Sequence, residues 1–297
     1  MNQNSGPVNN FMKFLQFPLT RILLGFVALG IVVTIAQAGL DVWPGDNTDI
    51  GYILLGCIVT TVCGLAYYGF VRVTERRAVT ELSFQKSIRE LIIGLMIGTM
   101  FFFITIGILW ILGYYRVLGV NPLAVIVPVL VFALFHGVFE ELLFRGILFR
   151  VTEESLGTWL AMVISALLFG ALHLTDPNAT LWSAIAVALT AGITLSATFA
   201  FSRRLWIPIG IHIAWNFTQS FFGLAVSGNN SQGLLNANLS GPILLSGGAF
   251  GIEDSILIVI MGLGVGVYFL WRAWDKGNFI KPFWKQTQLM LGDANAL

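Results

Sequence analysis

The chain has 297 residues, of which 57% are hydrophobic and 10% are charged, and its formal net charge is +1 at pH 7. Its mean hydropathy of +0.84 lies well outside the range of soluble domains. The net charge gives no information on nucleic-acid binding, but no basic cluster interleaved with aromatic residues indicates it. The lack of strict two-residue alternation argues against a membrane β-barrel. The composition therefore indicates an all-α polytopic membrane protein.

Long apolar stretches recur along the whole chain. Each approaches the roughly 20 residues that a helix needs to cross the hydrocarbon core of a bilayer. We count about eight candidate transmembrane helices by this criterion, at approximately 21–41, 50–71, 91–113, 122–149, 156–174, 180–201, 206–226 and 252–271. Helices are expected because backbone groups in lipid must form hydrogen bonds within their own segment.

Composition and motif content divide the chain into three parts. Residues 1–121 hold the first three expected spans and a charged loop at 72–90. We expect this loop to form an amphipathic interfacial helix that anchors the protein on anionic lipid. Residues 122–226 hold the next four spans, and residues 227–297 hold a polar loop, the last span and a basic C-terminal tail. The polar loop, 227–250, is expected to be a flexible outer loop; a gate over a cavity is the alternative.

The positions of the basic residues predict the orientation in the membrane. If the N-terminus is cytoplasmic, all of the 16 Lys and Arg residues except Arg116 belong to the cytoplasmic side. The opposite orientation would invert this ratio, so the positive-inside rule predicts that the N-terminus and the C-terminus are both cytoplasmic. We expect an integral multi-pass protein and take a bacterial cytoplasmic membrane as its location.

The fourth span ends in FHGVFEELLFRGILFR and carries two adjacent carboxylates, Glu140 and Glu141. An unneutralised charge in a bilayer costs about 2.5 kcal/mol or more. Glu141 lies four residues before Arg145, so the two share a helix face and can form an ion pair. Glu140 points about 100° away, toward the face of His136, and has no basic partner at helical spacing. Glu140 is therefore the unexplained charge, and His136 is either a packing residue or its hydrogen-bond partner.

Two later spans carry histidines. The fifth ends in FGALH, in which His173 lies 16 residues after an expected turn at Gly157, while Glu140 lies 17 residues before that turn. At about 1.5 Å per residue, both lie roughly 25 Å from the turn and hence at one depth. The seventh span contains HIAWN, in which His212 and Asn216 are four residues apart and converge on one face. A carboxylate, two imidazoles and an amide can activate water and stabilise an oxyanion.

These motifs resemble the CPBP family of intramembrane proteases, which includes the type II CAAX prenyl endopeptidases and the bacteriocin-processing or Abi proteins. The family pattern is E-E-x-x-x-R, then F-x-x-x-H, then H-x-x-x-N, on successive transmembrane helices. This chain has EELLFR at 140–145, FGALH at 169–173 and HIAWN at 212–216, with no departure at any motif position. The resemblance covers the region from residue 122 to residue 222.

The resemblance implies roles for individual residues. Glu140 matches the carboxylate that activates a water molecule together with the histidine matched by His173. His212 and Asn216 match the pair that stabilises the tetrahedral oxyanion. The remaining motif positions, which have a supporting role, correspond to Glu141 and Arg145.

We therefore expect an intramembrane endopeptidase, with membrane lipid and a membrane-embedded or lipidated peptide as its partners, and no nucleic acid. No cofactor is expected. A zinc-dependent version of the same protease is the minority alternative, because Glu140, His173 and His212 would form a known type of catalytic zinc set. A non-enzymatic protein that binds or transports peptides is the second class, since intramembrane Glu and His also serve proton relays. The lack of internal repeats and the intact motifs favour the protease.

Overall fold

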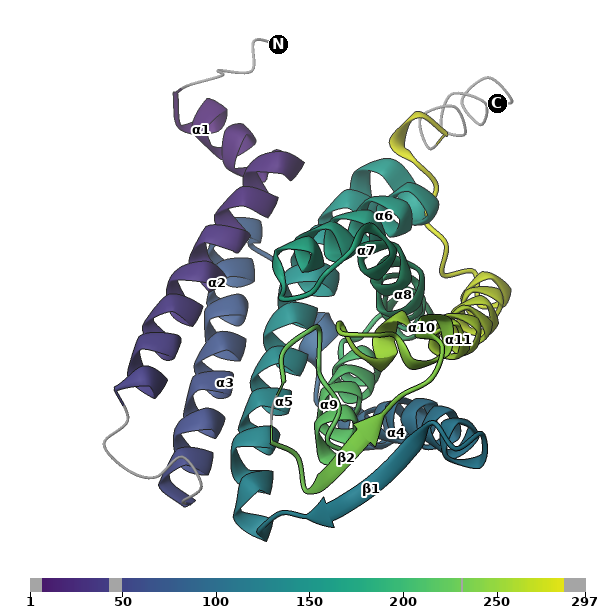
Figure 1. Ribbon diagram of the computed structural model, residues 1–297. Helices are drawn as coiled ribbons and strands as arrows, with labels where there is room; N and C mark the ends of the chain where they lie inside the picture. The colour runs from purple at the N-terminus through teal and green to yellow at the C-terminus, as the bar shows by residue number, and fades with distance from the viewer. Residues whose placement is uncertain (1–6, 43–49, 231, 286–297) are drawn as a thin grey trace.

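The computed structural model describes residues 7–42, 50–230 and 232–285, and most of them are helical (Figure 1). The α-helices are α1 (Pro7–Gln16), α2 (Pro18–Asp41), α3 (Ile50–Phe70), α4 (Ser87–Ile111), α5 (Ile126–Glu141), α6 (Arg150–Leu172), α7 (Leu181–Val187), α8 (Ile193–Ser202), α9 (Trp206–Phe221), α10 (Ile243–Ser246) and α11 (Ile256–Asp275). Two antiparallel strands, β1 (Tyr115–Val120) and β2 (Leu235–Leu239), form a small ribbon. The predicted all-α polytopic class is confirmed.

Among the described residues, six helical stretches are long and apolar enough to cross a membrane. One of them, Leu123–Thr175, contains two of the expected spans in a single run of 53 residues. The expected span at 206–226 corresponds to α9, whose 16 residues are fewer than the roughly 20 that a straight crossing requires. The count of eight spans is therefore only approximate.

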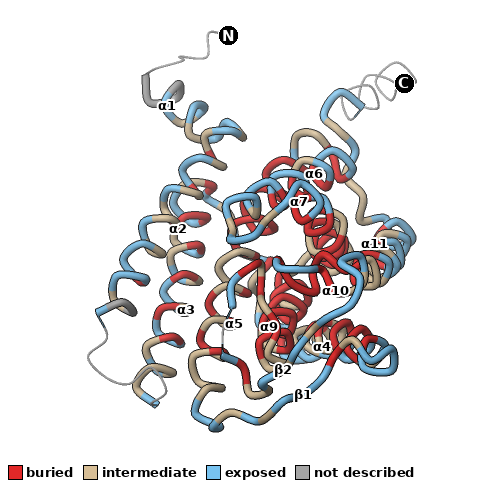
Figure 2. Tube along the Cα trace, viewed as in Figure 1, coloured by how far each residue is buried: buried red, intermediate tan, exposed pale blue. Residues whose placement is uncertain are grey.

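Helix α9 lies inside the bundle, and α4 and α5 pack against it. Figure 2 shows buried residues along α9, whereas α2 and α3 expose much of their surface. Glycines allow the close approach of α4 to α9: a Cβ added at Gly94 would lie 2.3 Å from the carbonyl oxygen of Ile207. Small residues at helix contacts are typical of membrane bundles. This packing holds α9 rigidly beside the helix that carries the two adjacent carboxylates.

The predicted turn at Gly157 is present. Gly157 has φ 79° and ψ 167° within the run assigned to α6, so the chain reverses there. A side chain would collide with the C-terminal segment, because an added Cβ would lie 2.8 Å from the carbonyl oxygen of Ile280. Between α5 and this turn, residues Leu142–Phe149 form a π-helical stretch. The turn therefore folds the later part of α6 back against this π-helical stretch, where Phe169 contacts Phe144.

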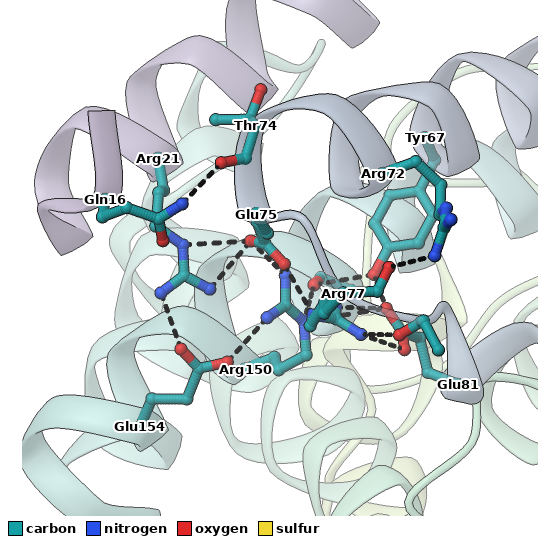
Figure 3. Close-up of polar contacts among 12 residues, drawn as sticks. Gln16, Arg21, Tyr67, Arg72, Thr74, Glu75, Arg77, Glu81, Arg150 and Glu154 are labelled. Atoms are coloured by element: carbon teal, nitrogen blue, oxygen red, sulfur yellow. Dashed lines mark hydrogen bonds and ion pairs between the residues drawn. The ribbon is translucent and has the colours of Figure 1, made fainter. Parts of the chain in front are cut away.

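The expected amphipathic helix at 72–90 is wrong. This segment contains a π-helical turn at Val71–Glu75, a 3₁₀ turn at Thr80–Leu82 and the start of α4. Arg76 and Lys86 adopt left-handed conformations that interrupt any continuous helix. Two of its acidic side chains, Glu75 and Glu81, are buried in a charge network (Figure 3) rather than placed on a lipid surface. The members of this network are Arg21, Glu75, Arg77, Glu81, Arg150 and Glu154.

The bundle has two distinct ends (Figure 1). Helix α1 lies at one end, together with the charge network, and the β1–β2 ribbon lies at the other. The polar segment 227–250 contains β2 and α10, so part of the expected outer loop is regular structure. The division of the chain into three parts stays a prediction.

Candidate active site

A cavity of about 120 Å³ lies between α5, the end of α6 and α9, and all four predicted catalytic residues line it. Glu140 comes from α5, His173 from the 3₁₀ turn that follows α6, and His212 and Asn216 from α9. Since a water molecule needs only about 10–15 Å³ by this measure, several fit beside these side chains. The structure thus brings together the residues that the three separate motifs predicted.

Glu140 lies between two imidazoles. Nδ1 of His136, one helical turn earlier, donates to Oε1 of Glu140 at 3.1 Å. On the other side, Nε2 of His212 lies 3.7 Å from Oε2 of Glu140. Of the two interpretations of His136 offered by the sequence, the hydrogen-bond partner is correct. Glu140 forms no ion pair with Lys or Arg within the described part of the chain.

Glu141 forms the predicted ion pair and also a contact that the sequence did not predict. Nη1 of Arg145 donates to Oε1 of Glu141 at 2.7 Å, and both side chains are fully buried. The same oxygen accepts a hydrogen bond from Nδ1 of His212 at 2.8 Å. Because an ionised carboxylate can only accept, Nδ1 of His212 carries the hydrogen, and its Nε2 is directed toward Glu140. Glu141 therefore fixes the orientation of the His212 ring.

Arg145 is held on three sides. Its Nη2 donates to the carbonyl oxygens of Ala191 and Gly192 at 2.8 and 3.2 Å. These carbonyls lie in a π-helical turn, Ala188–Gly192, a type of irregularity that frequently occurs at functional sites. The guanidinium also lies 4.8 Å from the ring centre of Phe169, in cation–π geometry. Arg145 thereby connects the fourth expected span to the fifth and the sixth.

His173 has one ring nitrogen fixed by the backbone. Nδ1 lies 2.7 Å from the carbonyl oxygen of Phe169, to which it donates. Its Nε2 is then the acceptor nitrogen of a neutral imidazole. No direct hydrogen bond joins His173 to Glu140 among the described residues, although both line the cavity. A water molecule between them would be in reach of both groups.

Asn216 lies one helical turn after His212 and is only 5% exposed. Its side-chain amide has no hydrogen-bond partner in the described part of the chain, although it lines the cavity. A buried amide without a hydrogen bond costs free energy. A polar group that enters the cavity can therefore form hydrogen bonds with the amide of Asn216 and remove this cost.

Sequence reasoning missed two acidic residues that line the same cavity, Asp176 and Glu253. Glu253 accepts hydrogen bonds from the indole Nε1 of Trp215 at 2.6 Å and from the backbone N–H and the hydroxyl of Ser227 at 2.8 and 3.1 Å. Ser227 also lines the cavity, so the segment 227–250 does contribute to it. The available signal was positional, since Asp176 follows His173 by three residues and Glu253 lies at the start of the last expected span, 252–271.

Fold and cavity together define a multi-pass membrane protein with a buried Glu–His–Asn site. Residues 121–218 match the family model described as Type II CAAX prenyl endopeptidase Rce1-like. This match confirms the resemblance predicted for residues 122–222 and covers the helices that carry all three motifs.

A curated relative agrees with the family match. The chain is 29% identical over 93 residues to a Bacillus subtilis (strain 168) protein named "Putative membrane peptidase YdiL". The aligned segment is 31% of this chain and 36% of that protein, so the chain spans about a third of the length of this relative. No solved structure matches the chain. The similarity is thus to a protein named as a membrane peptidase, and it covers about a third of this chain.

Proposed function

We propose that the protein is an intramembrane endopeptidase in which Glu140 activates a water molecule for attack on a peptide bond. The observation that carries this proposal is the convergence of Glu140, His173, His212 and Asn216 on one cavity. A carboxylate that lacks a Lys or Arg partner, beside a cavity large enough for water, is a suitable general base. The substrates we propose are membrane-embedded or lipidated peptides. We also propose that the protein lies in a bacterial cytoplasmic membrane with both of its termini on the cytoplasmic side.

In the proposed reaction, Glu140 takes a proton from the water molecule while the water oxygen bonds to the scissile carbonyl carbon. The free Nε2 of His173 accepts the second hydrogen of this water and so holds its lone pair toward the substrate. The electron pair of the carbonyl moves to its oxygen, which becomes the oxyanion. When the tetrahedral intermediate collapses, the C–N bond breaks and the proton held by Glu140 passes to the leaving amine.

His212 and Asn216 supply the donors for the oxyanion. The amide of Asn216 is unpartnered and therefore available for this bond. His212 lies between Glu140 and Glu141, so a protonated imidazole there is stabilised on both sides and can donate from Nε2. Donors fixed in a site from which bulk water is excluded stabilise developing charge strongly. Glu141 and Arg145 act on the reaction only through the orientation of His212.

The donor set was compared with the needs of the zinc alternative. Within the described residues, no three His, Cys, Asp or Glu side chains are arranged to hold a metal ion. The Nδ1 atoms of His173 and His212 already form hydrogen bonds to Phe169 and Glu141, which leaves only the two Nε2 atoms. We propose a reaction without zinc, and the proposed steps use none. Metal analysis of purified protein, with cleavage measured before and after chelation, tests this part of the proposal.

The test of the proposed function is Glu140→Gln in the full chain reconstituted in lipid nanodiscs. Membrane-anchored peptides are supplied as a mixture, and products are identified by mass spectrometry. Loss of the general base is expected to reduce cleavage by about 10²–10⁴-fold. Glu154→Gln, the same chemical change in the charge network, should retain cleavage because Glu154 is remote from the cavity.

Two outcomes would contradict the proposal. Retained cleavage by Glu140→Gln would remove its role as general base. Wild-type protein that binds the peptides without cutting any of them would instead support the non-enzymatic peptide-binding alternative.

A further inference from the structure

We propose that the cavity wall formed by Asp176 and Glu253 binds a cationic group of the substrate, so that the protease prefers a Lys, Arg or free amino group near the scissile bond. This inference rests on the proposed function. The proposed substrates differ from peptides in which a free C-terminal carboxylate lies next to the cleaved bond.

The residues that line the cavity carry negative charge. Three carboxylates line the cavity, those of Glu140, Asp176 and Glu253. Among the described lining residues there is no Lys or Arg, and three histidines are the only other titratable groups. Arg145 lies behind the wall, fully buried and paired with Glu141. The cavity therefore presents net negative charge to whatever enters it.

Hydrogen bonds hold the side chain of Glu253 in this wall. It is 4% exposed, yet its three hydrogen-bond donors, from Trp215 and Ser227, are all neutral groups. Within the described residues, Glu253 accepts these hydrogen bonds but forms no ion pair. Its negative charge is thus stabilised by dipoles but not cancelled, and it adds to the field in the cavity.

Asp176 is the accessible part of the wall. Its side chain is half-buried and makes no hydrogen bond or ion pair in the described part of the chain. Burial raises the pKa of Asp176, and the negative charges of Glu140 and Glu253 raise it further, against the opposing effect of His173. Burial leaves this carboxylate poorly solvated, and no Lys or Arg among the described lining residues supplies a compensating positive charge. A substrate cation would supply it.

The second, independent observation is the unpartnered amide of Asn216, which is buried and directed into the same cavity. An amide in this state points to a ligand with a polar group, and a peptide carbonyl provides one. A peptide bonded there would pass close to the Asp176 wall. A peptide with a C-terminal carboxylate at the same position would be repelled by the negative charge of Asp176, so binding of such a peptide is disfavoured.

The experiment uses the reconstituted full chain and sets of matched peptides. Each set contains one membrane-anchored sequence with Lys, with Gln and with Glu at the positions flanking the cleaved bond. Each is also prepared with a free and with an amidated C-terminus close to that bond. Relative kcat/KM values are measured by mass spectrometry for wild type, Asp176→Asn, Asp176→Lys and the exposed control Asp275→Asn.

Wild type is expected to prefer Lys over Gln by about fivefold or more, as one partly exposed ion pair of about 1 kcal/mol provides. Amidation of a nearby C-terminus should improve cleavage. Asp176→Asn should reduce the preference for Lys by a similar factor, Asp176→Lys should invert it in favour of Glu, and Asp275→Asn should leave it unchanged.

The outcomes separate the two proposals. Cleavage by wild type with equal kcat/KM for Lys, Gln and Glu peptides would overturn the cationic preference and leave the peptidase intact. A preference that persists in Asp176→Lys would overturn the role of this wall. Absence of cleavage of every peptide by wild type would overturn the proposed function itself.

Discussion

The α1 end of the helical bundle and the region around the cavity both contain buried charged groups, but these groups have different partners in the two regions. At the α1 end, three arginines meet three glutamates in one network (Figure 3). Around the cavity, the carboxylates have no Lys or Arg partner among the described residues; they are Glu140, Asp176 and Glu253. In the network at the α1 end, each carboxylate is already paired with arginine. The carboxylates around the cavity can still pair with a cationic group of a ligand.

Carboxyl groups outside the membrane-spanning helices reflect this difference in their pKa values. At the α1 end, burial alone would raise the pKa of Glu81, but hydrogen bonds from Arg77 and Tyr67 hold it below its ordinary value. Next to the cavity-lining residue Glu253, burial raises the pKa of Asp254 to about 6, and the hydrogen bond from Ser183 only partly opposes this. The sign of the shift thus distinguishes a charge that is matched from one that is not.

Buried charge therefore has two uses in this protein. Matched charges join α2, the segment after α3 and the start of α6, so their loss should lower stability. Unmatched groups leave hydrogen-bonding capacity free inside the cavity, so their loss should lower activity. The predictions below test this separation.

The largest effect is expected for Glu75→Gln. Glu75 pairs with Arg21 at 2.8 Å and with Arg77 and Arg150 at 2.7 Å each. Removal of its charge leaves three arginines without their common partner, and breaking a buried pair in this way costs about 3–5 kcal/mol. Thermal unfolding in nanodiscs, followed by intrinsic fluorescence, should show a large drop in the midpoint. The remaining folded protein should keep its specific cleavage activity.

A nearly equal effect, but on activity, is expected for Asn216→Ala. Loss of one oxyanion donor typically lowers kcat by about 10²–10³-fold, or 2.7–4 kcal/mol. Stability should change by less than about 1 kcal/mol, because the Asn216 amide has no partner to lose within the described residues. Cleavage rates and unfolding midpoints of the same preparations provide the check. A variant that unfolds easily but cleaves normally when folded would reverse the interpretation of the region around the cavity.

The sequence predicted the contacts that local helix geometry determines. Glu141 and Arg145, four residues apart, form their ion pair even though a π-helical stretch begins at Leu142. The matched distances of Glu140 and His173 from Gly157 place both on one cavity. In these cases, residue spacing along a helix is enough to fix the relative positions of the side chains.

Contacts between distant segments could not be predicted in this way. The bond from His212 to Glu141 depends on how α9 packs against α5, and a single sequence contains no pattern for that packing. Residues 72–90 have the composition of an interfacial helix, but Glu75 and Glu81 are buried because arginines from other helices reach them. Glu253 lies in a short 3₁₀ turn and Asp176 directly follows another, and hydrophobic periodicity gives no information on segments this short.

A smaller effect of opposite sign is expected for Asp254→Asn. The folded-state pKa of Asp254 is about 6, against an ordinary value of 3.8, so its ionised form destabilises the fold. This destabilisation is fully present above about pH 6 and disappears as the pH falls toward 3.8. The variant should therefore be more stable than wild type by about 1–2 kcal/mol at pH 8, and the difference should close by pH 4. Unfolding midpoints measured across this range test the prediction; a difference that does not depend on pH would contradict it.

The smallest effect is expected at the edge of the charge network, for Glu154→Gln. Glu154 pairs with Arg21 and Arg150 at 2.7 Å each, like the buried members, but its side chain is 40% exposed. Water can solvate the arginines when this carboxylate is neutralised, and exposed pairs typically contribute less than about 1 kcal/mol. The unfolding midpoint should thus fall only slightly, in contrast to Glu75→Gln. Equal losses for the two variants would mean that the number of ion pairs, and not their burial, determines the stability of this end of the bundle.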